Sequence, residues 1–353
     1  MTLLEQCSFS RLEKYGKCSY LYWLHYWKPI PRPVTDTVPT VAGTVAHAVL
    51  EVFYPIDGNN RVVSTLDLLN QYWEDRLKEE GLESCFTELQ YIALQMETLH
   101  ARATEGYTGP DPILNKDGKF GKMYKKTNAW SDALRDSGIA SLAASINETA
   151  GQKHKLWATV SLSEVFSETY VFLKNYRDTM AFLSIYMLEM PISRDDDQQP
   201  VNTVYWPGTA IEFTGFLDVI ATDPQGRIYI IDHKTSKDKP DENKVAHWEQ
   251  LLLYGWAMHQ LWGRYPDYIG INSLRGNVLT VAAFDPSLIE GAMNRALGKM
   301  RGIHGELFYQ SNPTDYGSPC YNDFSPENSC AYLSHCHPRF FQAVRYKIEG
   351  KRA

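Results

Sequence analysis

Two carboxylates and a lysine are spaced in this 353-residue chain so that a β-hairpin would bring them together. Asp232 and Lys234 lie two residues apart in the run RIYIIDHKT, so both side chains project from one face of a strand and His233 projects from the other. Asp218 lies in the preceding run, TAIEFTGFLDVIAT, and residues 223–226 between the runs are typical of a turn. Folding the hairpin there places Asp218 opposite Asp232 or the residue before it, about 5 Å away.

Carboxylates this close repel each other, and a divalent cation between them would relieve the repulsion. Because the ligands are hard oxygen atoms, Mg²⁺ or Mn²⁺ is the expected ion. Such an ion activates a water molecule and polarises a phosphoryl oxygen, and Lys234 would position that water and balance the charge of the phosphate. The short D-x-K pattern also describes an Asp–Lys pair on an exposed strand, but Ile228, Ile230 and Ile231 indicate a largely buried one.

A long helical pattern follows this strand over residues 241–262 and ends at Gly263. Gln250 and Tyr254 are four residues apart in it and therefore share one face of the helix. An amide and a phenol in that position could orient a DNA phosphate or the lysine. A capping or interhelical hydrogen bond is the structural alternative for this pair.

Helical patterns dominate the first 190 residues, and β-rich runs follow them. Further predicted helices cover 11–27, 43–54, 64–80, 85–103, 162–189 and 286–308, and two further strands cover 268–276 and 278–285. Ser10 with Glu13 is typical of a capping box at the start of the first helix. A mixed sheet built late in the chain, with helices contributed early, predicts an α/β or α+β fold.

Composition excludes several classes of protein. With 44% hydrophobic and 22% charged residues, the chain is not disordered, collagen-like or a coiled coil. No apolar run approaches the roughly 18 residues of a membrane span, and the N-terminus lacks the apolar core of a signal peptide, so we expect a cytoplasmic protein without a membrane partner. The net charge of −7 argues against coating of duplex DNA. It allows a local basic segment that contacts the phosphates of a DNA strand, either the lysine-rich segment 115–128 or the tail 345–353, although each could be a solvated loop.

Five motifs in order resemble the RecB-like branch of the PD-(D/E)XK nuclease superfamily. The central motifs of that branch, G-x-x-D, D-x-K-T and Q-x-x-x-Y, match Gly215 to Asp218, Asp232 to Thr235, and Gln250 to Tyr254. Two N-terminal motifs match as well: Ser10-x-Leu12-x-x-Tyr15-x-x-Cys18 resembles S-x-L-x-x-Y-x-x-C-P, with Ser19 in place of the proline, and Gly43-Thr44-x-x-His47 resembles G-x-x-x-H. The resemblance covers residues 8–54 and 210–336.

This resemblance implies a restriction-endonuclease-like core, with a mixed central sheet flanked by helices and a helical insert. It implies His47, Asp218 and Asp232 as ligands of Mg²⁺ or Mn²⁺, although His47 taken alone is more typical of a buried core histidine. The backbone carbonyl of His233 would complete the metal shell. Lys234 would be the catalytic lysine, and Gln250 and Tyr254 would support the placement of DNA and of the lysine. The expected division is 1–54 (N-terminal helices), 55–200 (helical insert), 201–310 (core with the hairpin) and 311–353 (Cys-rich tail).

The cysteines narrow the resemblance to one subgroup. Cys320, Cys330 and Cys336 lie in the last tenth of the chain, and with Cys18 they resemble the iron–sulfur version of this nuclease, known in AddB, in CRISPR-associated adaptation nucleases and in phage-type relatives. There, one N-terminal and three C-terminal cysteines hold a [4Fe–4S] cluster, which here would join the first helix to the tail. Zn²⁺ fits four thiolates equally well, and unligated buried cysteines are a further alternative. The remaining two, Cys7 and Cys85, are expected in the core.

The activity that the resemblance implies is that of a metal-dependent DNA exonuclease acting on single-stranded or end-resected DNA, in recombination, repair or phage DNA processing. If the protein is phage-encoded, its location would be the host cytoplasm. The sequence contains no G-x-x-x-x-G-K-[ST] motif, so any helicase would be a partner protein. Two other functions remain open at this point. One is a catalytically idle DNA-binding scaffold with a nuclease fold, and the other is a metal- or cluster-binding protein without a nucleic-acid partner.

Overall fold

The computed structural model describes residues 4–28, 30, 37–53, 65–104, 138–194, 198–236, 238–313, 320, 330 and 332–342. The lysine-rich segment 115–128 and the basic tail 345–353, both considered above as phosphate-contacting segments, lie outside these residues. Within the described part of the chain, no helix combines the length and the apolar character needed to cross a membrane.

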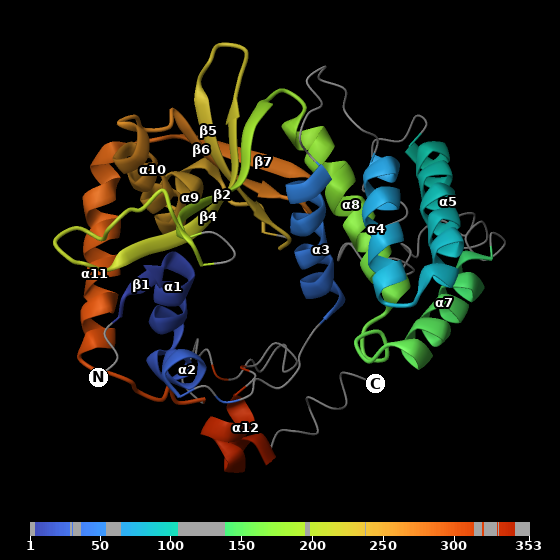
Figure 1. Ribbon diagram of the computed structural model, residues 1–353, viewed down its shortest axis with the longest axis horizontal. Coiled ribbons are helices and arrows are strands. Elements are labelled where there is room, and N and C mark those ends of the chain that lie inside the picture. Colours follow the sequence, from blue (N-terminus) through green and yellow to red (C-terminus); the bar gives the residue numbers. More distant parts are fainter. Residues whose placement is uncertain are drawn as a thin grey trace.

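A mixed β-sheet lies at the centre of the fold (Figure 1). Its strands among the described residues are β1 (Gln6–Ser8), β2 (Ser184–Arg194), β3 (Pro200–Val201), β4 (Glu212–Thr222), β5 (Ile228–Lys234), β6 (Tyr268–Ser273) and β7 (Val278–Ala283). The order across the sheet is β3-β2-β4-β5-β6-β7, and β1 pairs with the beginning of β4. The β1–β4 and β5–β6 pairs are parallel, whereas the other neighbours are antiparallel.

Helices cover both faces of this sheet. The α-helices are α1 (Phe9–Lys17), α2 (Ser19–Tyr22), α3 (Val38–Phe53), α4 (Thr65–Glu79), α5 (Phe86–Thr104), α7 (Ile139–Lys153), α8 (Leu162–Met180), α9 (Glu242–Ala246), α10 (Glu249–Trp262), α11 (Ile289–His304) and α12 (Leu333–Cys336). Short helices of other types are η1 (Trp23–Trp27), η2 (Glu83–Cys85) and η3 (Pro286–Leu288). In Figure 1, α3, α4, α5, α7 and α8 gather to one side of the sheet, and α1, α10 and α11 lie on the other.

Two hydrophobic clusters occupy the two faces of the sheet. One contains Val219 and Ile231, and the other contains Ile220 and Ile230, so β4 and β5 are buried on both faces. A strand of this kind is a continuous apolar run, as β5 is in the sequence. The predicted fold class, a mixed sheet flanked by helices, is therefore confirmed.

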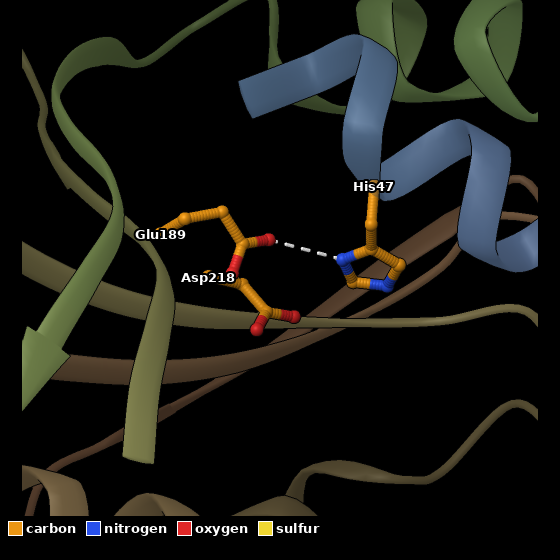
Figure 2. Close-up of side chains that lie close together, drawn as sticks. All are labelled: His47, Glu189 and Asp218. Carbon is orange, nitrogen blue, oxygen red and sulfur yellow. Dashed lines mark hydrogen bonds and ion pairs between the residues drawn. The ribbon is translucent and has the colours of Figure 1, made fainter. Parts of the chain in front are cut away.

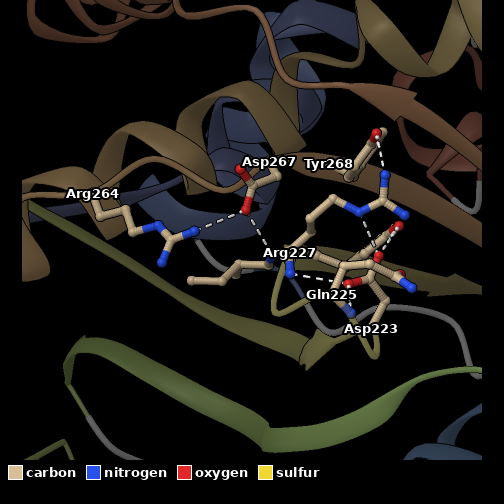
Figure 3. Close-up of polar contacts among 8 residues, drawn as sticks. Asp223, Gln225, Arg227, Arg264, Asp267 and Tyr268 are labelled. Atoms are coloured by element: carbon tan, nitrogen blue, oxygen red, sulfur yellow. Dashed lines mark hydrogen bonds and ion pairs between the residues drawn. The ribbon is translucent and has the colours of Figure 1, made fainter.

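The predicted β4–β5 hairpin is held at its turn by one aspartate (Figure 3). The carboxylate of Asp223 accepts hydrogen bonds from the backbone N–H groups of Gln225 and Arg227, each at 3.0 Å. It also accepts from the Arg227 guanidinium at 2.6 Å, and that guanidinium donates to the Tyr268 hydroxyl on β6 at 3.1 Å. Asp267 accepts from the backbone N–H of Ile228 at 2.7 Å and from Arg264 at 3.0 Å. These contacts fix the hairpin against β6, and thereby fix the catalytic candidates at its open end.

The helix predicted over 162–189 is wrong in its second part. α8 ends at Met180, and residues from Ser184 onward form β2, which pairs antiparallel with β4 along nearly its whole length. The pairing shifts register between Ile185 and Met187. Hydrogen bonds to a long neighbouring strand outweigh the helical pattern of a short apolar run, which periodicity alone cannot assign. Because β2 belongs to the central sheet, a sheet strand falls inside the range 55–200 that the sequence predicts as a mainly helical insert.

The N-terminal prediction also changes in detail. The side chain that caps α1 is Ser8, whose hydroxyl accepts from the backbone N–H of Arg11 at 3.3 Å, whereas Ser10 lies inside the helix. The reason is that β1 ends at Ser8 after pairing with β4, so the chain must turn into the helix there. The long helix predicted over 241–262 is interrupted at His247 and Trp248, between α9 and α10.

Candidate functional site

Three side chains from three elements converge beside the sheet (Figure 2). His47 comes from α3, Glu189 from β2 and Asp218 from β4, and one donor atom of each lies within 4.8 Å of those of the other two. His47 Nδ1 is 3.1 Å from Glu189 Oε1. Leu188 pairs with Val219 and Met190 with Leu217, so Glu189 lies opposite Asp218 in the sheet. Oxygen and nitrogen donors this close form a candidate site for a divalent cation.

A glycine lets the helix that carries the histidine approach the hairpin. A Cβ atom added to Gly43 on α3 would lie 3.1 Å from Cγ2 and 3.2 Å from Oγ1 of Thr235, the residue after β5. These distances are shorter than ordinary van der Waals contacts, so a larger residue would require α3 or the Thr235 side chain to shift by a few tenths of an ångström. His47 lies one helical turn further along the same helix, which explains physically why the G-x-x-x-H and D-x-K-T motifs occur together.

Asp218 lies in an environment that disfavours its charged form. Burial raises its pKa, as do the nearby carboxylates of Asp232 and Glu189, and the resulting pKa is about 8 despite the opposing effect of His47. The backbone N–H of His233 donates to Asp218 Oδ2 at 2.7 Å and holds the carboxyl in place. A cation bound among these groups would offset the repulsion, so the donor set fits the Mg²⁺ or Mn²⁺ that the sequence predicts.

Asp232 and Lys234 face the helix α10, on the opposite side of β5 from His233. Asp232 is buried, its Oδ2 lies 2.6 Å from Lys234 Nζ, and its Oδ1 accepts from the Gln250 amide at 2.9 Å. Burial lowers the pKa of Lys234, but the adjacent Asp232 carboxylate more than compensates and the pKa is raised. The lysine is therefore charged and forms an ion pair with the Asp232 carboxylate.

The predicted helical pair lies in the same cluster. The Gln250 amide donates to the Tyr254 hydroxyl at 3.2 Å, and its oxygen accepts from Lys234 at 3.4 Å. A Cβ atom at Gly215 on β4 would lie 3.2 Å from the Tyr254 ring, so this glycine makes the space that the tyrosine occupies. Burial raises the pKa of Tyr254, which keeps its hydroxyl protonated and able to donate.

His233 projects away from this cluster, as the alternation of the strand predicts. Its ring meets that of Tyr176 on α8 edge-on, with 4.9 Å between centroids, and both ring nitrogens are buried without a hydrogen-bond partner among the described residues. Burial lowers the pKa of His233, so the ring is neutral. The structure thus assigns the side chain of His233 to packing and its backbone N–H to the orientation of Asp218.

A cleft of about 480 Å³ opens in front of these residues. Asp218, Lys234, Gln250 and Tyr254 line one side of it, and Arg11 and Arg194 are among the residues that line the rest. Asp218 and Lys234 are therefore accessible to a ligand, and two arginines line the same cleft, of which Arg194 is paired with Glu212 at 2.6 Å. Such groups suit a substrate with negatively charged phosphates.

The four cysteines predicted to act together come from opposite ends of the chain and lie near one another. Cys18 precedes α2, Cys336 ends α12, and the backbone N–H of Cys330 donates to the carbonyl of Cys320 at 3.0 Å. Burial raises the pKa of the Cys336 thiol to about 12, and the proximity of Cys330, Cys320 and Cys18 adds to the effect. Hydrogen bonds link the N-terminal region to the tail and to the segment that precedes it. The Tyr332 hydroxyl donates to the carbonyl of Ile30 at 3.3 Å, and the backbone N–H of Tyr309 donates to the Ser19 hydroxyl at 2.8 Å.

The other two cysteines are buried in the hydrophobic clusters, as predicted. Cys7 lies in one cluster and Cys85 in the other. Burial raises the pKa of Cys7 to about 12, so this thiol stays protonated.

Fold and site together define an α/β protein with an acidic metal-site candidate beside a buried Asp–Lys pair. A comparison with protein families matches residues 6–116 and 117–337 to the PD-(D/E)XK nuclease superfamily. The chain therefore belongs to this superfamily, and its mixed sheet with flanking helices is consistent with the nuclease core. Among curated proteins, no sequence matches this chain.

Glu189 is the member of the site that the sequence analysis missed. The residue lies in LSIYMLEMPI, which the helical interpretation of 162–189 places on a helix. Its backbone φ of 41° is in the left-handed region, which is uncommon for a residue with a side chain. An acidic residue within an apolar run was the available signal, since a half-buried strand of the central sheet would not carry it without a function.

Proposed function

We propose that this protein is a metal-dependent DNA nuclease, most specifically an exonuclease that hydrolyses single-stranded or end-resected DNA. The observation that supports it best is the convergence of His47, Glu189 and Asp218 next to the Asp232–Lys234 pair, of which Asp218 and Lys234 line an open cleft. Membership of a nuclease superfamily supports the reaction class. DNA is the proposed partner, with a helicase or recombination protein as a further one, and recombination, repair or phage DNA processing in the cytoplasm is the proposed setting.

Each residue has a role in the proposed reaction. His47, Glu189 and Asp218 would hold Mg²⁺ or Mn²⁺, and Asp232, whose carboxylate is near that of Asp218, would be a further ligand. When bound, the ion supplies Lewis acidity toward a phosphate oxygen and lowers the pKa of water. Lys234 positions the attacking water and offsets the negative charge that develops on the phosphate. Gln250 and Tyr254 hold the lysine and Asp232 in place through the hydrogen bonds described above.

To test this proposal, purified protein is incubated with three DNA substrates: end-labelled linear single-stranded DNA, end-labelled linear duplex DNA and circular single-stranded DNA. Each reaction contains Mg²⁺, Mn²⁺ or EDTA, and Asp232→Asn is assayed in parallel. We expect metal-dependent loss of linear DNA that Asp232→Asn abolishes, with circles spared. Intact DNA with every metal, from a folded protein, would instead favour a catalytically idle scaffold or a metal-binding protein without a nucleic-acid partner. DNA binding that weakens with salt distinguishes these two.

For the cysteines we propose a [4Fe–4S] cluster held by Cys18, Cys320, Cys330 and Cys336, as in the iron–sulfur subgroup of the RecB-like branch. What supports it is a set of four thiol donors brought together from two ends of the chain. Elemental analysis of anaerobically purified protein tests it: about four iron atoms per chain are expected, and Cys336→Ser should lose them. About one zinc per chain without iron would contradict the cluster and assign the site to Zn²⁺.

A further inference from the structure

A second groove lies beside the active-site cleft and has a volume of about 740 Å³. Phe9, Glu13, Lys234 and Gln250 line both spaces, so the two meet at the catalytic lysine. The groove runs between α1, the α9–α10 region and α11, whose residues complete its walls. We call it the lysine groove, after Lys17, Lys244 and Lys299, which line it from these three helices.

The carboxylates of the lysine groove already have partners. Glu13 pairs with Lys17 at 3.1 Å, and Glu249 pairs with Arg295 and, at 3.4 Å, with Lys299. Asp241 accepts from the backbone N–H of Lys244 at 2.8 Å and caps α9. Among the residues that the structure describes, no ion pair is assigned to the exposed Lys244 ammonium. Four lysines and three carboxylates line the groove, so in a chain of net charge −7 its lining has an excess of ammonium groups next to the proposed catalytic site.

An aromatic side chain lies within reach of these charges. Trp248, between α9 and α10, lines the groove and is partly exposed. The Lys244 ammonium is 5.9 Å from the centroid of its ring. A phosphate bound by Lys244 would therefore place the attached base beside the indole. Phe9 provides a second aromatic ring at the junction with the active-site cleft.

We propose that the lysine groove binds the nucleotides next to the scissile phosphate, with Lys17 and Lys244 on the backbone and Trp248 stacked on a base. This inference rests on the proposed function, because it takes the scissile phosphate to lie at Lys234. It specifies a single strand as the substrate in the groove, since only unstacked bases offer a free face to an aromatic ring. A groove that combines ammonium groups with aromatic rings has the composition of a single-strand channel.

The test measures binding without cleavage, in EDTA, to a fluorescein-labelled single strand of about 15 thymidines and to a blunt duplex. The variants are Lys17→Gln with Lys244→Gln, which alter exposed side chains, and Trp248→Ala with Trp248→Phe. One matched control is Lys155→Gln, in the turn between α7 and α8 of the helical lobe, by which we mean α3, α4, α5, α7 and α8. The other is Trp262→Ala at the other end of α10, where the side chain is 41% exposed.

We expect the double lysine variant to reduce the slope of log affinity against log salt by roughly 1.4 for the single strand. Trp248→Ala should weaken single-strand binding about tenfold, and Trp248→Phe should retain most of the affinity. Because Trp248 also packs against the core, thermal denaturation must show that the Trp248 variants fold. If these variants do not fold, the double lysine variant alone tests the inference.

Two results would overturn the inference while leaving the proposed nuclease intact. One is a wild-type protein that cleaves linear DNA while the double lysine variant binds the single strand with unchanged affinity and salt dependence. The other is tighter wild-type binding to the blunt duplex than to the single strand. A wild-type protein that neither binds nor cleaves DNA would remove the proposed function itself, and the groove's role with it.

Discussion

Lys234 is bound to Asp232 at 2.6 Å, and its amine also meets the Gln250 amide oxygen, so its position is fixed before any substrate arrives. A charge that is held in position in this way stabilises a transition state far more than a mobile lysine in water would. Asp232 and Lys234 could be predicted together from the sequence because strand alternation is strict. Their distance from Asp218 followed from a recognisable turn.

Lys234→Ala should therefore reduce kcat at least about a hundredfold, since it removes charge stabilisation without removing a proposed metal ligand. Mn²⁺ binding, followed by calorimetry, should persist in this variant. The control is Lys155→Ala, an exposed lysine on the helical lobe, which should behave as wild type. Cleavage by Lys234→Ala at the wild-type rate would show that the lysine has no part in the reaction.

The charge on Asp218 links metal binding to stability. Its pKa in the folded protein is raised from 3.8 to about 8, so folding favours the protonated form. A group raised in this way contributes less stability as pH rises through this interval, because the unfolded chain is already ionised. The metal-free protein should accordingly lose thermal stability between about pH 5 and about pH 8, and Mn²⁺ should offset the loss at the upper end.

Differential scanning calorimetry in EDTA and in Mn²⁺ measures this effect. Asp218→Asn should show a smaller loss of Tm over the same pH interval and little stabilisation by Mn²⁺. If the metal-free wild-type protein is equally stable at both pH values, or gains stability as pH rises, the electrostatic description of Asp218 is incorrect.

At the scale of the elements, the site depends on how closely α3 approaches the β4–β5 hairpin. Gly43→Ala places a methyl group 3.1 Å from the Thr235 side chain, closer than an ordinary contact, and should displace His47. Alanine favours helices over glycine by roughly 0.5–1 kcal/mol. This gain should offset the unfavourable contact with Thr235, so the free energy of unfolding should change little. Activity should fall roughly tenfold to a hundredfold, as expected for a displaced ligand.

A second substitution separates this explanation from general damage. Thr235→Ser removes the methyl group nearest to the added Cβ, so Gly43→Ala with Thr235→Ser should recover part of the lost activity. Kinetic assays of both variants, together with urea denaturation, provide the comparison. Equal activity of Gly43→Ala and wild type would mean that the close approach is not required.

The elements also show where sequence analysis reaches its limit. The hairpin, α10 and the last two strands were predictable because their patterns are local: alternation, a turn and a terminal glycine. β2 was not, because it becomes a strand by pairing with β4 rather than through its own pattern. With β2 assigned to a helix, Glu189 could not be brought opposite Asp218, and the acidic site remained incomplete.

At the scale of the whole molecule, a buried ion pair joins the helical lobe to the sheet. Arg275, in the turn between β6 and β7, lies 2.6 Å from Glu168 on α8, and their side chains are only 10% and 3% exposed. The Asn175 amide donates to the carbonyl of Leu274 at 2.5 Å in the same region. Contacts between residues about a hundred positions apart leave no local sequence pattern, so this junction could not be predicted from the sequence.

Arg275→Met should lower the free energy of unfolding by about 3 kcal/mol, since it removes the guanidinium that pairs with the buried Glu168 carboxylate. Adding Glu168→Leu should recover much of this loss. Arg264→Met, which breaks the exposed pair with Asp267, should cost less than about 1 kcal/mol. Equal losses for the buried and exposed variants in urea denaturation would contradict a structural role for the Arg275–Glu168 junction.

The central claim is that one acidic site both binds a divalent metal and supports DNA hydrolysis. The most direct test measures Mn²⁺ affinity and cleavage of linear single-stranded DNA in the same preparations of wild type and Glu189→Gln. Wild type should bind Mn²⁺ and cleave, whereas Glu189→Gln should bind Mn²⁺ at least about tenfold more weakly and cleave only as the Mn²⁺ concentration is raised. A folded wild-type protein that leaves DNA intact at saturating Mn²⁺, or a Glu189→Gln variant with unchanged Mn²⁺ affinity, would contradict this claim.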